Sequence, residues 1–124
     1  ETPVTLKRAI QDIEKAVGKG NVGINLDPAN LIMYGKANPV DALEVFGEYV
    51  MGIHGKDGKY PTDGHHLGDE VPLGQGKVNY SAFIAKLKEI GYQGDITIER
   101  EISGEEQKKD IRMAKELLDK LIAE

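Results

Sequence analysis

Apolar residues recur along the chain at two spacings, and segments of each kind alternate. Four segments carry an apolar residue at every third or fourth position, which predicts amphipathic helices with one buried face. These faces are formed by Leu6, Ile10, Ile13 and Val17, by Val40, Leu43 and Phe46, by Phe83, Leu87 and Ile90, and by Ile111, Ala114, Leu118 and Leu121. Residues suited to helix starts precede each face: Thr2, Asn38 and Asn79 as N-caps, and Ser103 with Glu106 as a capping box.

Three short runs rich in β-branched residues lie between these helices and read as strands: Val22–Asp27, Val50–His54 and Asp95–Glu99. A turn of irregular helix is expected near residues 30–35, and residues 55–78 form a long Gly-rich connection without periodicity. Connections of that length within a compact domain are uncommon and are often functional. The order is one helix followed by three strand–helix units, which predicts an α/β fold with a parallel sheet.

Composition narrows the class of protein. With 124 residues, 40% of them apolar and 30% charged, the chain suits one soluble globular domain. Its net charge of -5 argues against nucleic acid or an anionic membrane as the main partner. The absence of cysteine excludes disulfides and thiolate metal sites and suits the reducing cytoplasm, where we expect the protein to act. No apolar run approaches the roughly 20 residues of a membrane helix.

Each of the three predicted strands ends in a polar residue, and these residues lie on the same face. Because residues two apart share a face, Asp27, His54 and Glu99 are expected at the same sheet edge. In the middle strand the same alternation places Met51 and Ile53 beneath the helices, opposite Val50, Gly52 and His54. A single polar residue at a strand end is commonly just solvated. Three of the same parity favour a divalent-cation site, whose oxygen-rich donor set suits Mn²⁺, Mg²⁺, Co²⁺ or Zn²⁺.

Four stretches carry a resemblance to a known family: NLDPAN, HGKDG, LGQGKVNY and GYQGDITIERE. They resemble the later motifs of xylose-isomerase-like TIM-barrel proteins, a superfamily of sugar and sugar-phosphate isomerases, epimerases and inosose dehydratases. A full (β/α)₈ barrel has eight strands and about 250 residues. The resemblance therefore implies an incomplete TIM barrel with three parallel strands and about four helices, in which residues 1–124 are a single partial domain from the C-terminal part of the barrel.

The resemblance also implies an activity, isomerisation or epimerisation of a sugar through an enediolate. In the family one divalent metal is held by Glu, Asp, His and Glu, and Asp27, His54 and Glu99 match the last three of these. The strand that carries the first Glu would precede the opening helix, so the isolated chain is expected to be inactive without the missing strands. Glu99 is the expected catalytic residue, acting as ligand and in proton transfer.

Two further residues are candidates for binding the substrate. Lys56 has the same strand parity as His54 and could bind a substrate oxygen or phosphate; the alternative is a solvated loop lysine. Asn30 could bind a sugar hydroxyl, or it could serve only the turn after Asp27.

Other polar residues near these positions are expected to have different roles. Asp57 is expected to be structural, Arg100 to form a structural ion pair, and Glu101 to face the site or to be solvated. A solvated histidine pair is the preferred interpretation of His65 and His66 in the long connection, although loop closure could bring them to a substrate.

Two other functions compete with the isomerase. An apurinic-site endonuclease shares the barrel, but its multi-zinc site needs several strand-end histidines where this chain offers one. A non-catalytic assembly module could keep part of the metal site without turnover. Because three strands leave sheet edges open, we expect self-association or pairing with a missing N-terminal barrel segment.

Overall fold

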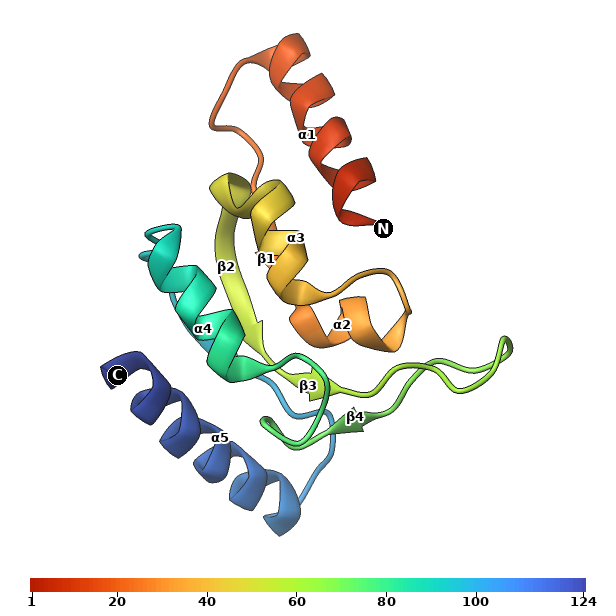
Figure 1. The fold of residues 1–124 in the computed structure, drawn as a ribbon, viewed down its shortest axis with the longest axis vertical. Coiled ribbons are helices and arrows are strands. Elements are labelled where there is room, and N and C mark those ends of the chain that lie inside the picture. The colour runs from red at the N-terminus through yellow and green to blue at the C-terminus, as the bar shows by residue number, and fades with distance from the viewer.

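A parallel sheet of three strands organises the computed structural model, which describes residues 1–124 (Figure 1). Its strand order is β1-β2-β5, with β2 in the centre and parallel to both neighbours. The helices are α1 (Pro3–Val17), α2 (Pro28–Met33), α3 (Pro39–Phe46), α4 (Tyr80–Glu89) and α5 (Glu105–Ala123), with a 3₁₀ turn at Gly47–Tyr49. The strands are β1 (Ile24–Leu26), β2 (Val50–Gly55), β3 (Asp57–Gly58), β4 (Glu70–Val71) and β5 (Ile96–Ile98). This is the α/β architecture of a partial TIM barrel, as the sequence predicts.

Helix starts follow the predicted caps except at α5. Thr2 and Asn38 accept backbone N–H groups of α1 and α3, and a proline occupies the first turn of each helix. Helix α2 is more regular than expected because Asp27 caps it and Pro28 opens it. The predicted capping box at Ser103 is wrong: Gly104, at a φ of 82°, takes the N-cap position, and no side chain caps α5.

The core lies between the sheet and a layer of helices in which α1, α3, α4 and α5 are successive neighbours. Figure 1 shows α3 and α4 lying across the same face of the sheet. Phe46 of α3 and Phe83 of α4 are 1% and 0% exposed and pack among Ile32, Leu43 and Ile53 in one cluster. Burying side chains of this size contributes about 1.5–3 kcal/mol each. Ile111, predicted on the buried face of α5, is only half-buried, whereas Ala114, Leu118 and Leu121 are buried.

The predicted alternation fails at the start of β2. Ile24 pairs with Val50 and Asn25 with Gly52, so the register shifts by one residue between these pairs. Such a bulge reverses the faces on either side of it. Val50 therefore enters the core, and Met51 is 71% exposed rather than lying beneath the helices. After Gly52 the predicted alternation holds, with Ile53 buried and His54 half-exposed.

Residues 55–78 contain structure that the sequence pattern does not predict. Strands β3 and β4 form a short antiparallel pair, and the segment between them extends away from the body of the protein (Figure 1). The carboxylate of Asp57, 1% exposed, accepts backbone N–H groups from Gly58, Gly74, Gly76 and Val78 at 2.8, 2.9, 3.1 and 3.2 Å. Asp57 is thus structural, as predicted, and it fixes the connection against the sheet.

None of the helices is both long enough and apolar enough to cross a membrane.

Candidate metal centre

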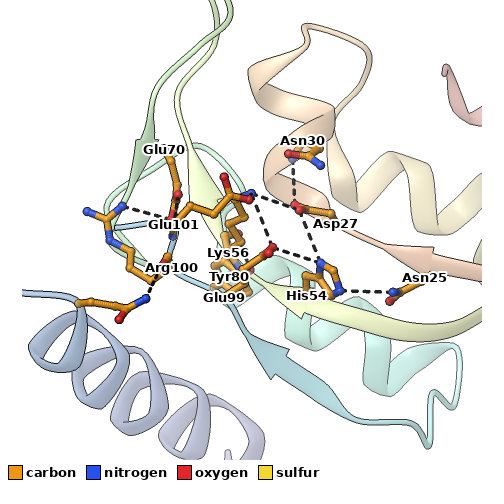
Figure 2. Close-up of polar contacts among 11 residues, drawn as sticks. Asn25, Asp27, Asn30, His54, Lys56, Glu70, Tyr80, Glu99, Arg100 and Glu101 are labelled. Carbon is orange, nitrogen blue, oxygen red and sulfur yellow. Dashed lines mark hydrogen bonds and ion pairs between the residues drawn. The ribbon is translucent and has the colours of Figure 1, made fainter. Parts of the chain in front are cut away.

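The carboxyl ends of the three parallel strands bring Asp27, His54 and Glu99 together, as the alternation predicts (Figure 2). Asp27 follows β1, His54 lies in β2, and Glu99 follows β5. His54 Nδ1 lies 3.3 Å from Glu99 Oε2 and 3.7 Å from Asp27 Oδ2. One ligand atom from each residue lies within 4.8 Å of the other two, a separation that a single cation can bridge.

The two carboxylate oxygens of Asp27 have different roles, one in capping a helix and one in the site. Oδ1 accepts the backbone N–H of Asn30 at 3.0 Å and so caps α2, while Oδ2 faces His54 and Lys56. The helix therefore fixes the carboxylate in position. The backbone of Asn30 has the turn role considered for it, and its exposed side chain stays a predicted contact for a sugar hydroxyl.

Lys56 lies beneath the cluster with only 3% of its side chain exposed, so the alternative of a solvated loop lysine is wrong. Its Nζ lies 3.6 Å from both Asp27 Oδ2 and Glu99 Oε2, and 2.6 Å from Glu101 Oε1. Burial lowers the pKa of Lys56, but the hydrogen bond to Glu101 and the charges of the three carboxylates outweigh it and raise the pKa overall. Lys56 therefore carries a positive charge in the site at neutral pH.

Glu101 faces the site, as its position two residues after Glu99 predicts, and it is not simply solvated. Its exposed carboxylate accepts the hydrogen bond from Lys56, which lowers the pKa of Glu101, and the positive charge of Lys56 lowers it further. The backbone N–H of Glu101 donates to Glu70 at 3.1 Å. Strand β4 thus helps to place the segment after β5.

Two residues of the site were missed by sequence reasoning. Tyr80 is buried at the start of α4, donates its hydroxyl to the Lys56 carbonyl at 2.7 Å, and accepts the Lys56 N–H at 2.9 Å. Burial raises the pKa of Tyr80, so the phenol stays protonated. Asn25 lies beside His54, with 3.3 Å between Asn25 Nδ2 and His54 Nε2. The sequence did contain a sign of Asn25, because the alternation places it on the same strand face as Asp27. No local pattern indicates Tyr80.

Other candidates lie outside the cluster. Arg100 Nε donates to the buried Asp110 at 2.8 Å, and its Nη1 lies 3.1 Å from Glu70, which confirms a structural ion pair. His65 and His66 are exposed, and His66 contacts Asp63. The set of Asp27, His54 and Glu99 is the one group of three or more potential ligands within reach of a shared ion. One histidine takes part, so the several strand-end histidines of a multi-zinc nuclease are not assembled here.

The donor set fits a divalent cation by chemistry and by charge. Two carboxylates and one imidazole offer the oxygen and nitrogen donors that such ions take. Asp27, Glu99 and Glu101 with Lys56 leave two uncompensated negative charges around the cluster. A divalent ion would balance them, which supports a metal centre at this sheet edge.

Comparisons with known proteins identify a family and solved structures to which the chain is similar. The family model described as xylose isomerase-like TIM barrel matches residues 2–121. A crystal structure of a xylose isomerase domain protein from Planctomyces limnophilus is 43% identical, with a TM-score of 0.83 over 93% of this chain and 43% of that one. A D-tagatose 3-epimerase-like protein is 27% identical, with a TM-score of 0.61 over 98% of this chain and 41% of that one.

Among curated proteins, the uncharacterized protein MJ1311 of Methanocaldococcus jannaschii is 32% identical over 99 residues, which cover 79% of this chain. The matched region spans 31% of MJ1311, and this chain covers less than half of each matched structure.

Proposed function

The chain belongs to the xylose isomerase-like TIM-barrel family, and on that premise we propose that it is the cation-binding C-terminal part of a sugar or sugar-phosphate isomerase or epimerase. The observation that carries this proposal is the convergence of Asp27, His54 and Glu99 at the carboxyl edge of the sheet. This edge is where active sites lie in TIM barrels. The epimerase-like neighbour supports the same class of reaction.

In this proposal Asp27, His54 and Glu99 hold one divalent cation, which suits Mn²⁺, Mg²⁺, Co²⁺ or Zn²⁺. When bound, the cation supplies a positive charge that acidifies the carbon next to a sugar carbonyl. Glu99 would accept the proton from that carbon and return it to the neighbouring carbon through an enediolate, whereas epimerisation would need a second acid on the opposite face of the enediolate. Lys56, 3.6 Å from the Glu99 carboxylate, is positioned to bind a substrate oxygen or phosphate and to stabilise negative charge.

The remaining barrel strands complete the site in this proposal. Both β1 and β5 are sheet edges, and an open edge of a parallel sheet leaves backbone groups available for pairing. Strands from a longer form of the protein, or from a second copy, would pair there. Light scattering at increasing protein concentration checks the second of these, because self-association raises the molar mass whereas a chain that does not self-associate keeps one mass.

Cation binding and proton transfer are tested separately. Loss of the free Mn²⁺ electron paramagnetic resonance signal measures binding, and deuterium incorporation from D₂O into a panel of ketoses and ketose phosphates measures proton exchange. We expect one Mn²⁺ per chain and exchange in a form that carries the complete barrel. Glu99→Gln should abolish the exchange, whereas Glu116→Gln, at an exposed position of α5, should leave it unchanged.

Each outcome separates the candidates. Undiminished exchange in Glu99→Gln removes Glu99 from the mechanism. Stoichiometric Mn²⁺ binding without exchange on any ketose in the complete form favours the assembly module over the isomerase. A chain that leaves the Mn²⁺ signal unchanged has no metal centre.

A further inference from the structure

The two ring nitrogens of His54 have different neighbours (Figure 2). Nδ1 faces the carboxylate of Glu99 at 3.3 Å, and Nε2 faces the side-chain amide of Asn25 at 3.3 Å. Gly52 makes room for that amide, since a Cβ on Gly52 would lie 3.0 Å from Asn25 Oδ1. Asn25 therefore lies next to Gly52 with its amide nitrogen directed at the ring.

A neutral imidazole carries one N–H, so its two nitrogens need partners of opposite kind. In the structure Asn25 Nδ2 contacts Nε2, and this contact is a hydrogen bond when Asn25 donates to an unprotonated Nε2. The proton then lies on Nδ1 and points at Glu99. An Nδ1 that binds a cation has lost this proton, and the ring then carries its proton on Nε2, which requires an acceptor.

We propose that Asn25 is a positioning residue that makes Nδ1 of His54 the cation ligand by changing from donor to acceptor when the cation binds. An amide can do both, because rotation by half a turn exchanges its N–H₂ group for its carbonyl oxygen. The proton on Nδ1 passes to solvent and Nε2 takes one from solvent, so the imidazole stays neutral. This inference rests on the proposed metal centre and adds a residue outside its ligand set.

Three substitutions separate this role from general packing. Asn25→Asp provides acceptors only, so Nε2 should carry a proton with or without the cation. Asn25→Ala provides neither donor nor acceptor. Gly52→Ala keeps the amide but its new Cβ displaces it, at a position without a positive φ. Because Asn25 is exposed, its replacement should leave the fold intact.

The experiment uses ¹⁵N-histidine-labelled protein and two-bond ¹H–¹⁵N correlation spectra, with His54 assigned by its loss in His54→Gln. In the wild type we expect the proton on Nδ1 without metal and on Nε2 after addition of Zn²⁺. Asn25→Asp should show a proton on Nε2 both without metal and after addition of Zn²⁺. Asn25→Ala and Gly52→Ala should lose the single preferred form without metal and bind Zn²⁺ about 10- to 100-fold more weakly.

Asn30→Ala is the matched control, because it removes an exposed amide on the other side of Asp27 that makes no hydrogen bond to His54. It should leave the His54 spectrum unchanged. A His54 tautomer that ignores every Asn25 substitution, while Zn²⁺ still binds, overturns the role of Asn25 and leaves the metal centre standing. A His54 spectrum that Zn²⁺ does not alter overturns the metal centre as well.

Discussion

Lys56 Nζ donates to Glu101 Oε1 at 2.6 Å, which joins the end of β2 to the segment that follows β5. The same ammonium lies 3.6 Å from a carboxylate oxygen of Asp27 and from one of Glu99. One buried positive charge thus holds three carboxylates that come from different parts of the chain. Without it, these carboxylates would repel one another across the site.

Replacing Lys56 by Met removes the charge and keeps most of the side-chain volume. We expect Lys56→Met to lower the free energy of unfolding by about 1–3 kcal/mol, less than for a fully buried ion pair because solvent screens Glu99 and Glu101. Added Mn²⁺ should raise the melting temperature more in Lys56→Met than in the wild type, because the ion replaces the lost charge. Thermal unfolding followed by circular dichroism, with and without Mn²⁺, measures both effects.

Lys59→Met is the control for that variant, because Lys59 is exposed and its side chain forms no ion pair. Its stability should stay within about 0.5 kcal/mol of the wild type. A Lys56→Met protein as stable as Lys59→Met, with no larger response to Mn²⁺, would contradict a balancing role for Lys56.

The Lys56–Glu101 pair should also make the stability of the fold depend on pH. The hydrogen bond from Lys56 and its charge lower the pKa of Glu101 below its ordinary value of 4.5. A carboxylate whose pKa is lower in the folded state stabilises the fold above the unfolded-state pKa, and that contribution is lost as the pH falls through the folded-state value. Glu101→Gln should therefore be less stable than the wild type at pH about 7, and the difference should shrink below pH 4.5.

Urea unfolding at neutral and acid pH measures that difference. Glu116→Gln removes an exposed carboxylate without an ion pair. The difference in stability between this variant and the wild type should not change in the same way as the pH falls. A gap between Glu101→Gln and the wild type that stays constant down to pH about 3 would mean that the charge of Glu101 contributes nothing.

The sequence predicted the order of the four longer helices and the three parallel strands, and the three converging side chains, because these depend on local periodicity. Asp27, His54 and Glu99 each close a strand, and parallel strands place their carboxyl ends together whatever the details of packing. The orientation of Met51 could not be predicted in this way. A one-residue register shift between β1 and β2 turns it outward, and the shift is a property of strand pairing that β2 alone does not encode.

Residues brought in from a distance could not be predicted from local patterns. Tyr80 reaches Lys56 across 24 positions, and Glu70 reaches Glu101 across 31. Strands β3 and β4 have two residues each, too few for any periodicity to register. The segment after β4 is held by hydrogen bonds from Gly74 and Gly76 to Asp57 rather than by apolar spacing. The predicted cap of α5 was wrong for a local reason: Gly104, with its positive φ, occupies the N-cap position expected for Ser103.

Asp57→Asn should be strongly destabilising although it changes one atom of the side chain. Each carboxylate oxygen accepts two backbone N–H groups, so an amide nitrogen in place of either oxygen leaves two donors facing a donor. A buried unpaired donor costs about 1–3 kcal/mol, so we expect a loss of about 3 kcal/mol or more. Urea unfolding measures it, with Asp12→Asn on the exposed face of α1 as the control expected to stay near the wild type.

Asn79 combines two features that substitutions can separate. Its φ of 61° and ψ of 70° are left-handed, and its Oδ1 accepts the N–H of Ala82 at 3.4 Å to cap α4. Asn79→Gly keeps the backbone conformation free of strain and should cost only a few tenths of a kcal/mol. Asn79→Ala loses the cap and forces a Cβ into the left-handed region, so it should cost about 2–3 kcal/mol.

The strain at Asn79 should also reach the metal centre, because Tyr80 is the next residue and its hydroxyl holds the backbone of Lys56. Melting temperatures of the two variants and their Mn²⁺ affinities measure the two effects together. We expect Asn79→Ala to be lower than Asn79→Gly in both quantities. Equal melting temperatures would show that the left-handed conformation is not what favours Asn at this position. A lower melting temperature with unchanged affinity would show that α4 and the metal centre are not coupled through Tyr80.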